Sequence, residues 1–249
     1  MANPIHQFEV TPITQNPLIV GGVDISFTNS ALWMMIAVVM SFCFFTLALQ
    51  KKAVVPGRLQ MFAEMLYSFV ANMVRENMGL EGRKYFPFVF TLFMIILLGN
   101  LLGMVPGSFT YTSHIIVTGA LALIVFFICT IIGFVRHGLH FFSFFLPAGV
   151  PWPLWPIIIP IEVLSFLIRP VTLSVRLFAN MMAGHLMLKV FAGFSVGMIG
   201  MGAVGVAMGM LPLLFNSVLI AFEILIALLH AYVFAVLSCI YLKDSIDLH

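Results

Sequence analysis

Charged side chains are scarce in this chain. Asp, Glu, Lys and Arg make up only 8% of its 249 residues, whereas 62% of the residues are hydrophobic. A soluble domain carries roughly a quarter charged residues because its surface faces water. The composition therefore excludes a soluble enzyme, a soluble nucleic-acid-binding protein and a secreted disulfide scaffold, and it predicts a protein of the lipid bilayer. The net charge of +2 identifies no partner.

Cysteines and early basic residues are also few. Cys43, Cys129 and Cys239 are widely spaced within apolar segments, so we interpret them as small core residues and not as disulfides or metal ligands. We expect no metal and no cofactor. No lysine or arginine precedes Lys51, so the start of the chain lacks the basic region of a signal or transit peptide.

Long uncharged segments predict the membrane-spanning helices. A span needs about 18 or more apolar residues, because one charge at mid-bilayer costs at least ~2.5 kcal/mol. We expect a first span over 29–50, a helical hairpin over 86–135, and two long helices that form a tilted hairpin over 157–242. The predicted fold is an all-α polytopic membrane protein with five transmembrane helices, a single membrane domain over 1–249 that starts with an outer-side segment at 1–28.

Residues 57–79 have a different pattern. Their apolar side chains recur at three- and four-residue steps, opposite a polar face that includes Arg58, Glu64 and Arg75. This pattern predicts an amphipathic helix that lies at the membrane surface. The alternative is a helix that packs on a soluble partner.

The basic residues predict the orientation. If the chain starts outside and crosses five times, eight basic residues fall on the cytoplasmic side, as the positive-inside rule requires. They are Lys51, Lys52, Arg58, Arg75, Arg83, Lys84, Arg136 and Lys243. The uncharged run 190–222 could form one more span, but its many glycines favour a reversal that leads into the last helix. Close helix packing is the alternative explanation for these glycines.

The helix expected over 157–189 is too long to stand upright. It would measure about 50 Å at 1.5 Å per residue, whereas the hydrocarbon core is about 30 Å thick. The helix must therefore tilt, bend or protrude, and Pro170 offers a bend within it. The final helix is of similar length and contains Pro212.

Ionisable residues form a stripe on the first long helix. Glu162, Arg169, Arg176 and Ala183 are seven residues apart, so they lie close to one helix face. Asn180 follows Arg176 by one turn. Arg176 cannot relay protons, because arginine stays protonated, but it can supply a fixed positive field. We interpret Arg169 as structural, since it can reach the interface.

A second polar stripe lies on the last helix, where Asn216, Glu223 and His230 repeat the seven-residue step. Glu223 and His230 can titrate, and so can His185, which points away from Arg176 on the preceding helix. Ionisable groups at membrane depth are functional candidates because their desolvation must be offset. A structural hydrogen bond remains the alternative for each of these three groups.

The segments that contain these residues resemble subunit a of the F-type ATP synthase. The resemblance is carried by SVRLFANMMAGH at 174–185 and AYVFAVLSCIYL at 231–242, and it covers nearly the whole chain. The segments PIHQFEV at 4–10, FPFVFTLFMIILLGN at 86–100 and GLHFFSFFLPAGVP at 138–151 are similar to the alphaproteobacterial and mitochondrial branch.

The resemblance implies a role for each candidate residue. Arg176 matches the family's essential arginine and Asn180 its neighbouring asparagine. His185 and Glu223 match the paired inlet residues, and Glu162 matches an acidic position of the exit path. His230 stands where many members have glutamine, which leaves its role open because an imidazole titrates and an amide does not.

The resemblance also implies partners and a location. The expected partners are a ring of small c-type rotor subunits, b-type subunits of the peripheral stalk and, indirectly, a soluble ATP-hydrolysing head, with no nucleic acid. Such a chain is no enzyme on its own, but it is an essential proton-translocating subunit of the bacterial inner membrane or, alternatively, the mitochondrial inner membrane. A rival is a secondary ion transporter with a midplane site, which predicts inverted repeats that the sequence does not show.

Overall fold

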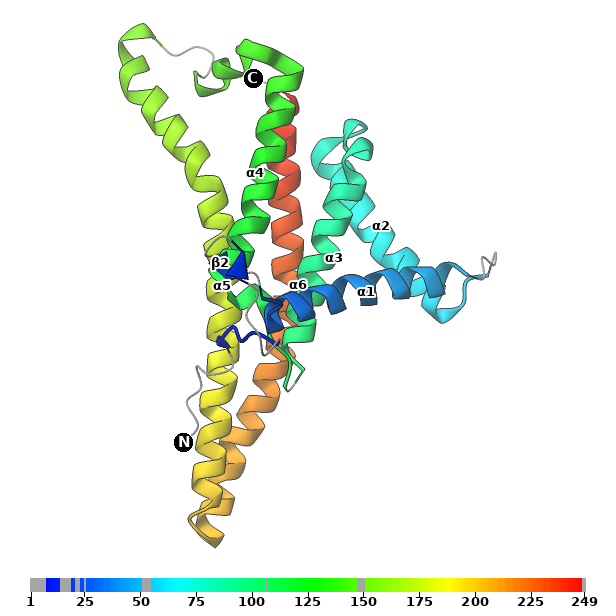
Figure 1. Ribbon diagram of the computed structural model, residues 1–249, viewed down its shortest axis with the longest axis vertical. Helices are drawn as coiled ribbons and strands as arrows, with labels where there is room; N and C mark the ends of the chain where they lie inside the picture. The colour runs from blue at the N-terminus through cyan, green and yellow to red at the C-terminus, as the bar shows by residue number, and fades with distance from the viewer. Residues whose placement is uncertain are drawn as a thin grey trace. The chain divides into compact units, whose positions relative to one another are not determined.

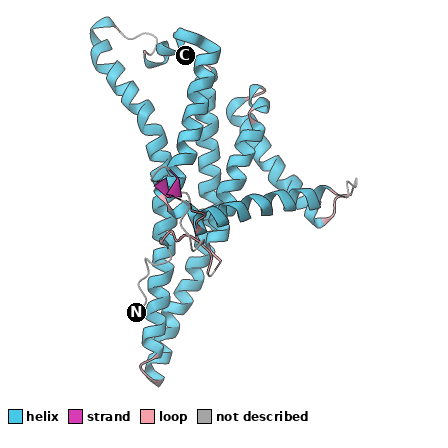
Figure 2. Ribbon diagram, viewed as in Figure 1, coloured by secondary structure: helices cyan, strands magenta, loops and turns pink. Residues whose placement is uncertain are grey.

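The structure is a computed structural model that describes residues 8–13, 19–20, 23–24, 26–50, 55–105, 107–146 and 151–247. Helices dominate it (Figures 1 and 2). The α-helices are α1 (Asn29–Leu49), α2 (Arg58–Met78), α3 (Phe86–Gly103), α4 (Ile115–His137), α5 (Trp155–Ile199) and α6 (Ala203–Ile246). The 3₁₀ segments are η2 (Glu81–Lys84), η3 (Tyr111–Ser113), η4 (Gly138–Phe145) and η5 (Trp152–Leu154).

The one small sheet of the described residues precedes α1. Strands β1 (Ile19–Val20) and β2 (Val23–Asp24) pair antiparallel, with Val20 opposite Val23. Helix α1 begins after Thr28, whose hydroxyl accepts a hydrogen bond from the amide of Ala31. The sheet is too short to change the fold class, so the prediction of an all-α polytopic protein is confirmed.

Five helical segments are long and apolar enough to cross a membrane, counted over the described residues. They are Asn29–Leu49, Phe86–Gly103, Ile115–Phe145, Trp152–Ile199 and Val204–Ile246. Many of their apolar side chains are exposed, such as Phe42 and Leu211. Lipid is the solvent that accepts such a surface. The five predicted spans are therefore confirmed, and the run 190–222 adds no sixth.

Helix α2 is the amphipathic helix that the sequence predicts. It starts after Gly57 and ends at Gly79, whose φ of 65° is a left-handed conformation that suits glycine. Val70, Met73 and Val74 are buried in the chain, whereas Phe62 is exposed. Its apolar face is therefore only partly covered by the rest of the chain.

The turn between the two long helices is short. Helix α5 continues to Ile199 and α6 starts at Ala203, so the chain reverses within residues 200–202, where Gly202 has a φ of 94°. The reversal that the glycines favour therefore lies within the run 190–222, and the rest of that run is helical. A Cβ atom on Gly205 would lie 2.0 Å from the carbonyl oxygen of Met198. Close helix packing, the alternative, explains this glycine.

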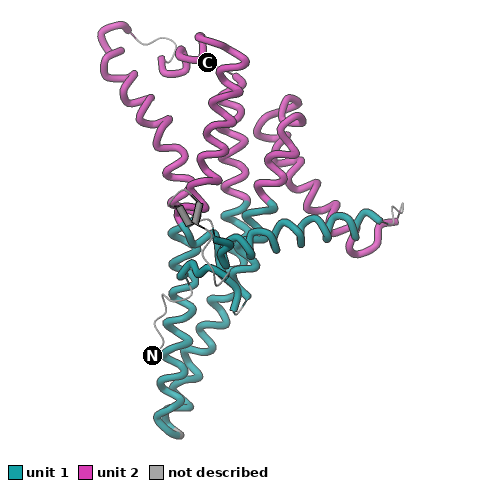
Figure 3. The backbone as a smooth tube through the Cα atoms, viewed as in Figure 1, with its two compact units in different colours: residues 1–50, 94–114, 178–231 teal, residues 51–93, 115–177, 232–249 magenta. Residues whose placement is uncertain are grey.

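The chain divides into two compact units, each built from distant segments (Figure 3). Unit 1 contains residues 1–50, 94–114 and 178–231. In it, the second half of α5 and the first half of α6 run side by side (Figure 1). The rings of Phe191 and Phe215 are in contact there. Helices of 45 and 44 residues extend for about 65 Å, roughly twice the hydrocarbon thickness.

Unit 2 contains residues 51–93, 115–177 and 232–249. Here α4 packs near the end of α6, where Nε2 of His137 lies 3.0 Å from the carbonyl oxygen of Ile246. Helix α4 also contacts the first half of α5, because the hydroxyls of Thr118 and Ser174 are 3.1 Å apart. Cys129 and Cys239 are buried, in agreement with their interpretation as core residues, whereas Cys43, in unit 1, is exposed, so the same interpretation is wrong for Cys43.

Candidate functional site

The candidate site lies in unit 1, between the paired halves of α5 and α6. Nδ1 of His185 on α5 lies 3.2 Å from Oε1 of Glu223 on α6. The two residues are buried, with 7% and 4% of their surface exposed. Burial of ionisable groups is costly, which makes this pair a candidate for a functional role.

The carboxyl group of Glu223 is poorly bonded. Both of its oxygens are buried without a hydrogen-bond partner among the described residues. The contact with His185 therefore meets the distance of an ion pair but lacks the alignment of a hydrogen bond. A structural carboxylate is held by several aligned donors, whereas this one is free to exchange a proton.

Gly184 lets Glu223 approach α5 closely. A Cβ atom at this position would lie 2.7 Å from Oε1 of Glu223. Any other residue would push the carboxyl group away from His185 or shift one of the helices. Gly184 therefore belongs to the site, because it leaves space for the carboxyl group of Glu223. No sequence pattern indicates this.

His185 and Glu223 each line a cavity of unit 1. The His185 cavity has a volume of about 600 Å³, and it is also lined by Glu9, Lys189 and Asn216. The Glu223 cavity has a volume of about 520 Å³. Cavities of this size hold many water molecules, and polar walls stabilise that water. Each partner of the pair therefore lies beside a space large enough for water.

The polar stripe predicted on α6 divides between these cavities. Asn216 lines the His185 cavity, and Glu223 and His230 line the Glu223 cavity. Oδ1 of Asn216 is buried without a hydrogen-bond partner among the described residues. Asn180 of α5 lines the Glu223 cavity as well. The structure thus brings Asn180, His185, Glu223 and His230 together.

Two buried uncharged residues, one beside His185 and one that joins α3 to α6, were not predicted from the sequence. The hydroxyl of Thr110 lies 3.1 Å from Nε2 of His185. Asn100, fully buried, donates a hydrogen bond of 3.2 Å to the carbonyl of Ala227 on α6. Asn100 interrupts an apolar run, which is a usable signal, whereas Thr110 lies in a turn-rich segment that offers none.

One face of α5 is open. Ala183 and Asn180 are exposed, whereas Met181 is only 1% exposed. Arg176, one turn before Asn180 on the same helix, is exposed too and belongs to unit 2. The helical phase predicted from the sequence, with Arg176 and Ala183 on one face and Met181 on another, agrees with these exposures.

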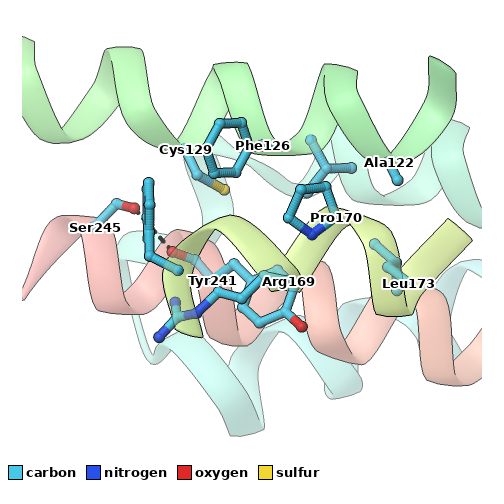
Figure 4. Close-up of a pocket in the computed structure, with 10 residues that line it drawn as sticks. Ala122, Phe126, Cys129, Arg169, Pro170, Leu173, Tyr241 and Ser245 are labelled. Atoms are coloured by element: carbon cyan, nitrogen blue, oxygen red, sulfur yellow. Dashed lines mark hydrogen bonds between the residues drawn. The ribbon is translucent and has the colours of Figure 1, made fainter. Parts of the chain in front are cut away.

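Unit 2 holds its charged residues in pairs. Nη1 of Arg169 lies 2.9 Å from Oδ2 of Asp244, and the guanidinium also lies 5.1 Å from the centre of the Tyr241 ring. Arg169 and Tyr241 line a cavity of only about 10 Å³, whose lining residues are drawn in Figure 4. Arg169 is therefore a structural residue here. Glu162 of α5 is half-buried and lines neither cavity of unit 1.

No group of three or more His, Cys, Asp or Glu side chains that could hold a metal ion occurs within the described parts of the chain. The site contains one carboxyl group and two imidazoles, on Glu223, His185 and His230. Such groups can accept and release protons.

The chain is similar to known proteins along its whole length. The sequence model of the ATP synthase A chain family matches residues 31–243. The chain is 53% identical to ATP synthase subunit a of Paramagnetospirillum magneticum over 252 aligned residues, which cover 100% of both chains. It is 52% identical to ATP synthase subunit a of Rhodospirillum rubrum, again over 100% of both chains. With the same protein of Mesorhizobium japonicum it shares 52% identity, over 98% of this chain and 96% of the relative.

Proposed function

Because this chain belongs to the ATP synthase A chain family, we propose that it is the stationary proton-conducting subunit of the synthase's membrane sector. It passes protons to and from a rotating ring through two offset half-channels. In this way a proton gradient drives ATP synthesis. The chain is no enzyme on its own, and it acts as the proton-translocating part of the complex.

The observation that carries this proposal is the buried His185–Glu223 pair with a cavity at each partner. A secondary ion transporter with a midplane site is the rival. Such a transporter is built from repeats with broken helices in both halves. Here α5 and α6 are continuous over 45 and 44 residues, which favours a stator over a transporter.

The inlet half-channel runs through unit 1. In the orientation that the basic residues favour, the turn at 200–202 and the segment 104–114 face the outside. Water in the His185 cavity delivers a proton to His185 and Glu223. Glu223 then passes the proton through its own cavity, past Asn180 and His230, to a carboxylate on the ring. The neutral carboxyl group tolerates lipid, so the ring can turn.

Arg176 separates the two half-channels. Its positive charge attracts an ionised ring carboxylate and repels a proton that moves directly between the channels. A ring site therefore releases its proton near Arg176 into the exit path by Glu162. Each proton that crosses 100 mV supplies about 2.3 kcal/mol, so several protons are needed for each ATP.

The proposal names partners and a location. The open face of α5 contacts a ring of c-type subunits, and b-type subunits of the peripheral stalk bind the lipid-facing helices. The nucleotide-hydrolysing head is coupled through the ring and the stalk. The curated relatives named above are bacterial, which supports the bacterial inner membrane over the mitochondrial inner membrane.

The barrier role is tested by Arg176→Ala in inverted membrane vesicles that contain the whole synthase. We expect the complex to assemble, ATP hydrolysis to persist and ATP-driven proton pumping to be lost, because protons leak past the ring. Arg58→Ala, on α2, is the control and should pump normally. Pumping by Arg176→Ala at the wild-type rate would contradict the proposal.

The rotor contact is tested by cross-linking. With Cys43, Cys129 and Cys239 replaced by alanine, Ala183→Cys should form an oxidative disulfide with cysteines placed along the outer ring helix. Met181→Cys is the matched control, two residues away and buried in the chain itself. Equal cross-linking at both positions, or cross-linking at Met181 alone, would show that this face of α5 does not meet the ring.

A further inference from the structure

The hydroxyl group of Thr110 lies between two polar atoms of unit 1. It donates a hydrogen bond of 3.2 Å to the carbonyl oxygen of Gly103, at the end of α3. The same oxygen lies 3.1 Å from Nε2 of His185. Thr110 is buried, so water does not compete freely for these contacts.

The hydroxyl group has a single proton, so it can donate only one of these two hydrogen bonds and must accept the other. A carbonyl oxygen only accepts, and the last carbonyls of an α-helix lack partners within the helix. The hydroxyl proton therefore belongs to the bond with Gly103. The oxygen of Thr110 can then only accept from His185, so Nε2 of His185 is the nitrogen that bears hydrogen.

From this geometry we propose that Thr110 is a positioning residue for proton transfer, which fixes the tautomer of His185 and leaves Nδ1 facing Glu223 as the atom that exchanges the proton. The inference rests on the proposed function, because it adds a residue to the same inlet. Thr110 touches neither the ring nor Glu223 in this account, and it acts through the imidazole.

The proton balance at the pair follows. Neutral His185 takes a proton from cavity water at Nδ1 and becomes an imidazolium, while Nε2–H stays bonded to Thr110. Nδ1 then releases the same proton to Oε1 of ionised Glu223, 3.2 Å away. In total, one O–H bond of a hydronium ion in the cavity breaks and leaves water, one N–H bond forms and breaks at Nδ1, and one O–H bond forms on Glu223, so that the imidazole returns to its starting tautomer.

Gly103 supports the same arrangement. A Cβ atom on this residue would lie 2.4 Å from the hydroxyl oxygen of Thr110. A side chain here would displace the hydroxyl from both of its partners. The close approach of the loop to the end of α3 is therefore possible because residue 103 is glycine.

The test compares two variants at one position in the whole synthase. Thr110→Val keeps the branched shape but loses the hydroxyl, and we expect ATP-driven pumping per assembled complex to fall roughly threefold to tenfold, the worth of one hydrogen bond. Thr110→Ser keeps the hydroxyl and should restore most of the rate. Thr112→Val is the control in the same segment, since the buried hydroxyl of Thr112 has no hydrogen-bond partner among the described residues.

A second readout reports the tautomer directly. Solid-state ¹⁵N NMR of the reconstituted synthase, labelled with [¹⁵N]histidine, should show His185 protonated at Nε2, with its signals assigned by their loss in His185→Gln. Thr110→Val should give a mixture of both tautomers. A purely structural role for Thr110 would lower the amount of complex without this change.

The outcomes separate this inference from the proposed function. If Glu223→Gln blocks pumping but Thr110→Val pumps at the wild-type rate, the inlet stands and the role of Thr110 is wrong. If Thr110→Ser is as slow as Thr110→Val, the shape of the residue and not its hydroxyl matters, which also overturns the inference. If Glu223→Gln itself pumps normally, the proposed inlet is wrong, and the role of Thr110 in it is overturned as well.

Discussion

The ionisable side chains of the two units are held in opposite ways. In unit 2, Arg169 binds Asp244 at 2.9 Å, and Arg136 donates hydrogen bonds to Glu81 from both terminal nitrogens of its guanidinium, the one from Nη2 at 2.8 Å. In unit 1, the carboxyl oxygens of Glu223 are buried without an aligned hydrogen bond among the described residues. The cavity beside Arg169 measures about 10 Å³, whereas the Glu223 cavity measures about 520 Å³.

This difference distinguishes residues that stabilise the fold from residues that we propose transfer protons. A paired charge with aligned hydrogen bonds is stabilised in one protonation state and changes it reluctantly. A buried carboxyl group without donors, beside a space for water, is easy to protonate and to deprotonate. We therefore expect substitutions in unit 1 to slow proton transfer, and substitutions at the pairs of unit 2 to reduce the amount of folded protein.

Among the substitutions that test this difference between the units, Gly184→Ala should have the largest effect on proton pumping. The added methyl group must displace Oε1 of Glu223, so the contact with His185 opens. We expect ATP-driven pumping per assembled complex to fall by about tenfold or more, since a misplacement of about 1 Å in a reactive pair costs up to 10²-fold. Gly193→Ala on the same helix is the control, because a Cβ atom there meets nothing within 4 Å. Equal pumping by both variants would mean that the position of Glu223 does not matter.

Arg169→Met should affect the amount of complex and not its specific rate. The substitution leaves Asp244 without its cation in a half-buried place. We expect the amount of assembled synthase in membranes to fall severalfold, as seen by blotting for this chain, while pumping per complex stays within about a factor of two. A normal amount of complex with abolished pumping would move Arg169 into the proton path.

His230→Gln should have a mild effect. His230 lines the Glu223 cavity but lies seven residues from Glu223 along α6, and an amide also binds water. We expect pumping to change by less than about twofold. A severe loss, restored by no other polar residue at this position, would make His230 an obligatory relay.

Glu81→Gln should have the smallest effect, and it should depend on pH. The hydrogen bond from Arg136 lowers the pKa of Glu81 below its ordinary value of 4.5. The pair therefore stabilises the fold above about pH 4.5, and this contribution is lost as the pH falls through the lowered pKa. Thermal unfolding of the purified complex should show a small difference between variant and wild type at pH 7, and the difference should shrink in acid. A difference that grows in acid would contradict this sign.

The fold was largely predictable from the sequence. Uncharged runs predict the spans because charge is excluded from lipid. The three- and four-residue pattern of 57–79 predicts α2. The reversal lies within the run 190–222, as predicted, but its exact place was not predictable, since Gly205 serves helix packing and the turn occupies only residues 200–202. Composition alone cannot separate a flexible glycine from a closely packed one.

The candidate site was predictable only in part. The seven-residue steps place Arg176 and Ala183 on one face and align Asn216, Glu223 and His230, because a helix fixes such relations locally. The contact between His185 and Glu223 spans 38 residues and depends on how α5 packs on α6. The ion pair of Arg169 with Asp244 and the hydrogen bond of Thr110 join residues 75 apart in sequence. No local pattern encodes these contacts.

Two isosteric carboxyl-to-amide substitutions, one in each unit, test most directly whether the proton path runs through the buried pair of unit 1. ATP-driven proton pumping is measured in inverted vesicles and divided by the amount of assembled synthase. We predict that Glu223→Gln assembles but loses at least about tenfold in this specific rate, as expected when a proton-transfer group is removed. Asp244→Asn should give less complex with a specific rate near that of the wild type. Normal pumping by Glu223→Gln together with a lost specific rate in Asp244→Asn would show that the proton path does not run through the buried pair of unit 1.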